Sequence, residues 1–303
     1  MTGGIEFRRI RPEDREALLA IAAQIWEGHD YLPLVFDPWV ADEKSYFAGL
    51  VLDGRLVGCG RLHPFDAKRG WLEGLRIEPG HQGQGLGYHM SRHVVRHACE
   101  AGLQELMFAT YFRNLGSVRI SERLGFSRGA TFTNLELKDL DAAGRWAEGI
   151  DRARVTEAAG LPPVPGYLSN DWFFIPPEVA DRQRYLPGAR TIREGEDLLV
   201  IAPNARYPQS LEICWMGTSG GEVRPGCLAQ AVARAVALGF REVHTMVPAD
   251  VSLQGFAAAG FAYQEEPHDV YLYSARTDDL RALLGAGGPP RGGYGAGSEP
   301  AAG

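Results

Sequence analysis

The sequence lacks several features that would assign its 303 residues to a specialised class of protein. It contains no run of about 18 apolar residues, so no membrane-spanning helix is expected. Its first residues are neither basic nor strongly apolar and do not resemble a signal peptide. Basic residues form no cluster, and 38 acidic residues outnumber 31 basic ones. This balance argues against nucleic acid or an anionic membrane as a partner.

The sequence also has few cysteines, and they are widely separated. Cys59, Cys99, Cys214 and Cys227 form no Cys-x-x-Cys pair of the kind that serves zinc or redox sites. Reduced thiols and a cytoplasmic location are therefore expected. With 45% hydrophobic and 23% charged residues, the chain has the composition of a globular protein, and its length predicts about two domains.

The first half of the chain has the pattern of a mixed α/β domain. Ile5–Ile10 is expected to form a strand, and a helix with one apolar face follows from Pro12 to Gly28. Two apolar runs joined by Asp53-Gly54 predict a β-hairpin. The pattern then predicts strand, helix, strand, short helix and strand, over Gly70–Ile77, Gly85–Ala101, Glu105–Thr110, Ser117–Leu124 and Phe132–Lys138.

Part of this pattern recurs in the second half. Gly102-Leu-Gln-Glu-Leu returns as Gly239-Phe-Arg-Glu-Val, and Leu124-Gly-Phe returns as Ala259-Gly-Phe. Around both copies the predicted order is helix, strand, short helix, strand. The sequence therefore predicts an α/β fold of two mixed-sheet domains in tandem, arranged as an intramolecular pseudo-dimer.

The expected boundaries follow from this repeat and from composition. Residues 1–140 are expected to form the first domain, residues 141–166 a helical linker and loop, and residues 167–284 the second domain. Residues 285–303 are rich in glycine and proline and are expected to be a disordered tail.

A glycine-rich loop, Gln82–Gly87, lies between a predicted strand and the long helix. Backbone N–H groups at a helix start attract phosphate, and glycine lets the backbone approach it closely. The spacing fits no Rossmann fingerprint, because Tyr88 stands at the third glycine position, and no Walker loop, because Gly-Lys-Ser/Thr is absent. A cofactor with a di- or triphosphate is expected.

This loop, with Ile77-Glu-Pro before it and Asn114 and Leu124-Gly-Phe126 after it, resembles the GCN5-related N-acetyltransferase (GNAT) family over residues 5–140. The resemblance implies acetyl-CoA as co-substrate, with its pyrophosphate on the loop, and no metal. It implies cofactor contacts for Leu75, Arg76, Ile77, Gln82, Gly83, Gln84, Gly85, Leu86, Gly87 and Asn114.

The same resemblance suggests catalytic roles. Glu73 stands alone in an apolar run, where related enzymes place a general base, and a backbone amide past a bulge near Leu75–Ile77 would polarise the thioester. Many relatives carry a tyrosine as general acid at the position of Ser121. Ser121, Tyr111 or Tyr88 remain as proton donors, although a thiolate is a tolerable leaving group without help.

The segment Trp26–Trp39 is expected to be an irregular recognition loop, with Asp30 and Tyr31 orienting the acceptor amine. Alternatively, its aromatic residues fill the flank of the sheet. Gly28–Pro33 and Glu73–Pro79 resemble the histidine N-acetyltransferase group. This likeness implies a free amino acid, such as histidine, or a similarly small amine as acceptor.

Two other sites are considered. Three histidines at helical spacing could bind zinc, but no further ligand is placed, so boundary positions are expected for His89, His93 and His97. Gly217–Gly221 fits a nucleophile elbow around Ser219, with Asp250 and His268 downstream. The repeat instead makes this segment a degenerate copy of the cofactor loop.

The second copy of the loop is expected not to bind coenzyme A. The repeat aligns Gly85 with Glu222 and Gly87 with Arg224, and Pro225 is expected to disturb the helix start. A carboxylate at this place would repel a pyrophosphate. The favoured function is an N-acetyltransferase acting on a small amine. The alternatives are a protein-amine acetyltransferase and an acyl-CoA sensor without turnover.

Overall fold

The computed structural model of the protein describes residues 4–285. The expected tail thus lies outside the described residues except for Gly285. The first half contains β1 (Ile5–Arg9), α1 (Arg15–Ala22), α2 (Leu32–Ala41), β2 (Tyr46–Leu52), β3 (Arg55–Pro64), β4 (Arg69–Ile77), α3 (Leu86–Glu100), β5 (Glu105–Tyr111), α4 (Leu115–Leu124) and β6 (Ser127–Leu137). Short 3-10 turns cover Pro12–Asp14, Trp26–Gly28 and Pro79–His81.

The second half begins with a helix and ends with one. It contains α5 (Leu140–Glu148), β7 (Thr156–Ala159), β8 (Leu168–Asn170), β9 (Phe173–Ile175), a 3-10 turn (Gln183–Tyr185), β10 (Arg190–Glu194), β11 (Asp197–Pro203), β12 (Ser210–Gly217), α6 (Pro225–Ala237), β13 (Glu242–Pro248), α7 (Gln254–Ala258), β14 (Ala262–Tyr263), β15 (Val270–Arg276) and α8 (Thr277–Gly285). Within residues 4–285, no helix has both the length and the apolar character needed to span a bilayer.

The two halves repeat one topology, as the sequence predicted. In the first half β2, β3 and β4 are antiparallel neighbours, and β4 runs parallel to β5 through the connecting helix α3. In the second half β10, β11 and β12 have the same arrangement, with β13 parallel to β12 and α6 as the connection. The predicted fold class, two mixed-sheet α/β domains in tandem, is confirmed.

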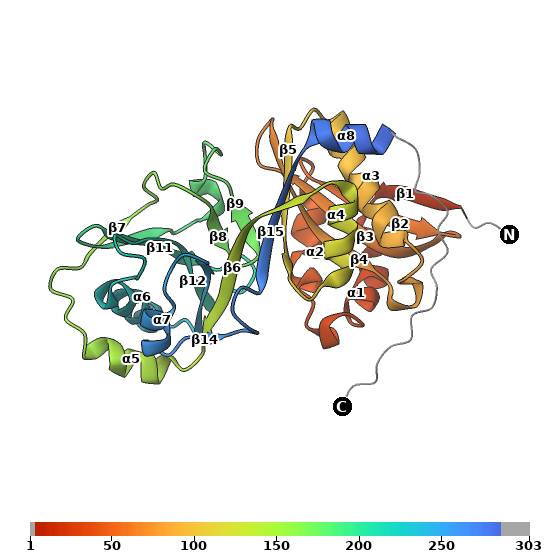
Figure 1. Cartoon of the computed structure of the whole chain (residues 1–303). Helices are drawn as coiled ribbons and strands as arrows, with labels where there is room; N and C mark the ends of the chain where they lie inside the picture. The colour runs from red at the N-terminus through yellow and green to blue at the C-terminus, as the bar shows by residue number, and fades with distance from the viewer. Residues whose placement is uncertain (1–3, 286–303) are drawn as a thin grey trace, which may run out of the picture.

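The strand β15 lies in the middle of the sheet, between strands of the first half. It is antiparallel to β5, with Val270 opposite Tyr111 and Arg276 opposite Glu105, and antiparallel to β6 on its other side. β6 in turn pairs with β13 of the second half. The two halves thus exchange their last strands, and Figure 1 shows β6 and β15 side by side where the halves meet.

The helix α8 follows β15 and completes the core of the first half. Leu280 of α8 and Tyr273 of β15 are buried in one cluster with side chains of α3 and β5. The Tyr273 ring stacks on Phe108, with the centroids 5.1 Å apart. Figure 1 shows α8 next to α3, far along the chain from it. The segment 1–140 therefore lacks part of the core around which it is folded.

The strands β4 and β5 are paired only where they begin. Arg69–Trp71 pairs with Glu105–Met107, and no ladder continues beyond these residues. A bulge interrupts β4, because both Gly74 and Leu75 lie opposite Gly60 of β3. Gly74 has a φ of +69°, and a Cβ there would lie 2.7 Å from the Trp39 ring, so glycine is required. The separation of the two strands opens a cleft.

Two local expectations were wrong. Residues 32–41 form the helix α2, not an irregular loop, and Phe36 and Trp39 are buried in the core. Pro33 suggested a loop, but it lies in the first turn of α2, where the missing N–H costs nothing. For the same reason Pro225 begins α6 instead of disturbing it.

A fragment of residues 1–140 is expected not to fold on its own. It would expose one edge of β5 and remove Tyr273 and Leu280 from its core. Each large buried side chain contributes about 2 kcal/mol, against a typical domain stability of about 5–15 kcal/mol. Near-ultraviolet circular dichroism and NMR would check this, and a cooperative melt with a dispersed spectrum from the fragment would contradict it.

Candidate active site

A cleft of about 1120 Å³ lies where β4 and β5 separate. Its walls in the first half come from β4, the glycine-rich loop, α3, β5 and α4. The second half adds residues from the β8–β9 turn and from the segment between β11 and β12, namely Asp171, Trp172, Asn204, Arg206 and Tyr207. The two halves therefore build one cleft together.

The glycine-rich loop leaves the start of α3 open to a ligand. Gly83 and Gly85 have φ values of +76° and +80°, and Gly85 is the residue that caps α3. The Gln82 side chain donates to the carbonyl of Ile77 at 3.0 Å and so fixes the loop to the end of β4. In the part of the chain that the structure describes, no backbone N–H from Gly83 to Tyr88 donates to another protein atom. N–H groups placed in this way at a helix start, together with the helix dipole, are the usual setting for a bound anion.

The equivalent helix start in the second half is closed by a carboxylate. Asp197 of β11 accepts hydrogen bonds from the N–H groups of Ser219 and Arg224, at 3.0 and 3.1 Å, and is 1% exposed. Arg224 caps α6 as Gly85 caps α3. The sequence alignment had placed the Glu222 carboxylate at this position, whereas in the structure the carboxylate there is that of Asp197. A second phosphate site is therefore blocked by the chain itself.

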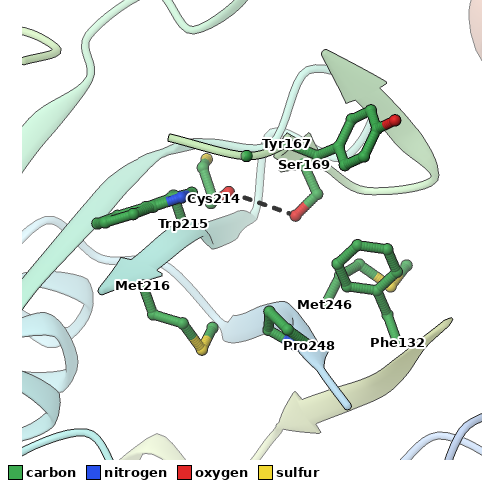
Figure 2. Close-up of a pocket in the computed structure, with 9 residues that line it drawn as sticks. Phe132, Tyr167, Ser169, Cys214, Trp215, Met216, Met246 and Pro248 are labelled. Carbon is green, nitrogen blue, oxygen red and sulfur yellow. Dashed lines mark hydrogen bonds between the residues drawn. The ribbon is translucent and has the colours of Figure 1, made fainter. Parts of the chain in front are cut away.

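The second half keeps only a small apolar remnant of the cleft. Beyond Ile213 and Thr245 the strands β12 and β13 separate, as β4 and β5 do. Figure 2 shows the cavity of about 180 Å³ that remains there, beside Met216, Met246 and Phe132. Its upper side is covered by β8, where the Ser169 hydroxyl donates to the carbonyl of Cys214.

Glu73 of β4 lies at the junction of the two halves. Its Oε1 accepts from Nη1 of Arg61 on β3, and its Oε2 accepts from Nη2 of Arg206, at 2.8 Å. The carboxylate side chain is only 6% exposed. Glu73 therefore has two charged partners in place of the apolar surroundings expected from the sequence, and both form charge-assisted hydrogen bonds with it.

Arg206 reaches Glu73 from the second half, and several neighbouring residues fix its position. Its Nη1 donates to Asp171 at 2.9 Å, and its guanidinium lies 4.2 Å from the Tyr31 ring centroid. Asn204 accepts from the backbone N–H of Arg206 at 2.8 Å and donates to Glu212 at 2.6 Å. Burial raises the pKa of Glu212 to about 8.

Asp30 and Tyr31 line the cleft, at the start of α2. Asp30 accepts two hydrogen bonds from Arg76, at 2.5 and 3.1 Å, and one from the N–H of Leu32 at 2.9 Å. Tyr31 lies between the guanidinium groups of Arg76 and Arg206. Burial raises the pKa of Tyr31, so its hydroxyl is neutral.

The candidate proton donors differ in their access to the cleft. Ser121 and Tyr111 line it, whereas Tyr88 is not among the lining residues and lies under Arg123. The Ser121 hydroxyl donates to the carbonyl of Ser117 at 2.8 Å, within α4. Burial raises the pKa of Tyr111. Asn114 also lines the cleft and caps α4.

The two alternative sites have other partners. His93 stacks on Phe7 and hydrogen-bonds to the Tyr46 hydroxyl at 2.8 Å, and no cluster of metal-binding side chains is found within residues 4–285. The Ser219 hydroxyl donates to Asp197 at 3.0 Å, so its partner is a carboxylate and not His268.

Sequence reasoning missed Arg61, Arg206 and Asp171. Arg61 could have been noticed as one charged residue in an otherwise buried strand. Arg206 and Asp171 gave no signal, because neither stands in a motif and both reach the site only through the fold.

These features define a class of protein: a mixed α/β fold in tandem, with one open phosphate-binding helix start beside separated strands. Residues 9–126 match the family model for the acetyltransferase (GNAT) family. This segment therefore matches the GNAT family, and the whole chain has the fold of two such domains in tandem.

Known relatives agree with this assignment. Histidine N-acetyltransferase of Xenopus tropicalis is 22% identical over 227 residues, covering 71% of this chain and 66% of the relative, just under two thirds of its length. A tandem GNAT protein from the clavulanic acid biosynthesis pathway has a TM-score of 0.59 at 17% identity, covering 90% of this chain and 99% of that one. A GCN5-related N-acetyltransferase from Sphaerobacter thermophilus has a TM-score of 0.59 at 13% identity, covering 90% and 96%.

The buried Glu212 predicts a pH-dependent stability. Between about pH 4.5 and 8 the unfolded chain has released a proton that the folded chain keeps, so the free energy of unfolding falls as pH rises. The slope is about 1.4 kcal/mol per pH unit. The variant Glu212→Gln does not lose stability in this way. The difference in melting temperature, variant minus wild type, is therefore expected to increase from pH 5 to pH 8. The exposed Glu196→Gln serves as control; equal shifts for both variants would contradict the prediction.

Proposed function

We propose that the protein is an acetyl-CoA-dependent N-acetyltransferase that transfers the acetyl group to the amine of a small molecule. The observation that carries the proposal is the row of free N–H groups from Gly83 to Tyr88 at the start of α3, beside the cleft. A pyrophosphate supplies the acceptor oxygens that these groups lack. The GNAT family match supports the same cofactor, and the four free, buried cysteines support a cytoplasmic location.

The residues around the bulge of β4 are proposed to assist the chemistry. The amine attacks the thioester carbonyl, and a backbone N–H after the bulge, at Leu75–Ile77, stabilises the negative charge that develops on the carbonyl oxygen. Glu73 takes up the proton that the amine releases, directly or through water. Coenzyme A leaves as a thiolate, and Tyr111 or Ser121 on the cleft wall can protonate it.

The acceptor is proposed to be a small amine. The cleft is narrowed by the second half, which brings Arg206 and Trp172 over the first. The curated relative is named for histidine, so histidine is one acceptor to test. A protein amine as acceptor is disfavoured by this covering.

An acyl-CoA sensor without turnover is the second candidate. It is favoured by one observation: Ser121 replaces the tyrosine that serves as general acid in many relatives, and its proton is already donated to Ser117. A sensor and an enzyme both bind coenzyme A, so only product formation separates them.

Gly85→Glu is expected to weaken coenzyme A binding by about 100-fold. A carboxylate about 5 Å from the pyrophosphate costs about 3 kcal/mol at an effective dielectric constant of 20. The matched control is Gly102→Glu, at the other end of α3. Both glycines have a φ near +80° and no neighbour within 4 Å of a built Cβ, so the backbone strain is the same. Calorimetry measures both affinities; equal losses in the two variants, or no binding by the native protein, would overturn the proposal.

Glu73→Gln is expected to lower the rate of acetyl transfer by about 100-fold or more and to leave coenzyme A affinity unchanged, because it removes only the proton acceptor. Thiol release with a panel of small amines measures the rate. An unchanged rate would exclude Glu73 as the base. Coenzyme A binding by the native chain, without turnover of small amines or of peptides with free amino groups, would favour the sensor.

A further inference from the structure

We propose that the acceptor is a small cationic amine that carries no carboxylate beside its amino group. This inference rests on the proposed acetyl transfer and names the substrate class. It is drawn from the charges buried at the acceptor end of the cleft, around Glu73.

The charged side chains around Glu73 form two groups of ion pairs that meet at the Tyr31 ring and together make one network. Arg61 joins Glu73 to Asp42, at 2.7 Å from the latter, and Arg206 joins Glu73 to Asp171, at 2.9 Å from the latter. The Tyr31 ring lies between Arg206 and Arg76, and Arg76 pairs with Asp30. The network thus holds four carboxylates, Asp30, Asp42, Glu73 and Asp171, against three guanidinium groups, Arg61, Arg76 and Arg206.

The neutral neighbours do not change this balance. His63 contacts Arg61 and the Ser45 hydroxyl, and burial together with the Arg61 charge lowers the pKa of its imidazole. Tyr31 is kept neutral by burial. The network therefore carries one net negative charge, in a count that includes Asp42, which is 27% exposed and lies outside the cleft lining.

An uncompensated charge in a buried site is costly, and a ligand of opposite charge relieves that cost. The ammonium form of an amine supplies one positive charge at this place. A carboxylate on the same molecule would add a fifth negative charge instead. It would also find its possible partners occupied: Arg61 and Arg206 each bind two carboxylates already, and the nitrogens of Arg76 donate to Asp30 and to the carbonyl of Leu75.

In the rest of the cleft, too, acidic residues outnumber basic ones. Glu136, Glu242 and Glu265 line it further along, whereas Lys138 is the one additional lysine or arginine among the described lining residues. Lys138 is itself paired with Glu136, at 2.7 Å. No free cation in this lining is thus placed to hold a substrate carboxylate.

The second half contributes one charge of each sign to the network, Asp171 and Arg206. Asp171 lies in the turn between β8 and β9 with a φ of +57°, which turns its carboxylate toward Arg206. Without Asp171 the network would hold three carboxylates and three guanidinium groups. The first half therefore holds the surplus, with three carboxylates against Arg61 and Arg76, and Asp171 keeps the charge of Arg206 from cancelling it.

The test compares matched acceptors on the full chain with saturating acetyl-CoA. Each pair differs only by the carboxylate: histamine with histidine, cadaverine with lysine, tyramine with tyrosine. The best acceptor is expected to be carboxylate-free, with kcat/KM at least about tenfold above that of its amino acid. Equal or better turnover of the amino acids overturns the inference and leaves acetyl transfer standing. Coenzyme A binding with no turnover of any of the six also overturns it, whereas absent coenzyme A binding defeats the proposed function itself.

Asp171→Asn tests the origin of the preference. Asparagine tolerates a positive φ, so the turn is kept while one negative charge is removed. The ratio of kcat/KM between an amine and its amino acid is expected to fall by at least about threefold. Asp278→Asn on α8 makes the same change of charge away from the cleft and should leave the ratio unchanged. A ratio that stays constant in Asp171→Asn would refute the role of this network.

Discussion

The backbone N–H groups at the start of α3 are the constraint on which the function of this fold depends. N–H groups at a helix start that lack a protein acceptor can bind water or an anion, and glycine at positions 83 and 85 keeps side chains out of the way. In the second half the chain itself supplies an acceptor: Asp197 accepts hydrogen bonds from the N–H groups of Ser219 and Arg224. The repeated structure thus gives one open helix start beside a large cleft, and one that a buried carboxylate caps beside a cavity of only about 180 Å³.

The exchange of the last strands explains how the closed copy still serves the open one. With β15 between β5 and β6, the two sheets become one, and the segment between β11 and β12 comes over the first cleft. Arg206 and Asp171 then meet Glu73, which lies 133 residues before Arg206 in the chain. The second half is both part of the first half's fold and part of the wall of its cleft.

Much of this architecture could be predicted from local sequence patterns. Asp53-Gly54 defined the hairpin, the glycine spacing defined the loop, and the Gly-x-x-Glu repeat defined the tandem order. These signals lie within a few residues of one another. The helix α2 was missed because its segment contains Pro33 and Pro38, which are more common in loops than in helices. Only the burial of Phe36 and Trp39 in the folded protein shows which face of the helix is apolar.

The strand exchange and the ion-pair network could not be predicted in this way. The alternation of β15 indicates a buried strand but is the same whichever neighbour it pairs with, so its place beside β5 is set by tertiary structure. The surroundings of Glu73 were misjudged for a related reason: the apolar run around it describes its own strand, whereas its partners come from β3 and from the second half.

The central claim is that only one of the two equivalent helix starts receives the cofactor. Amide hydrogen exchange with and without coenzyme A tests it most directly, because it reports on the same backbone N–H groups in both copies. The account predicts new protection over residues 83–88 and no change at Ser219 and Arg224, whose N–H groups already donate to Asp197 in the free protein. New protection at Ser219 and Arg224, or none over residues 83–88, would contradict it.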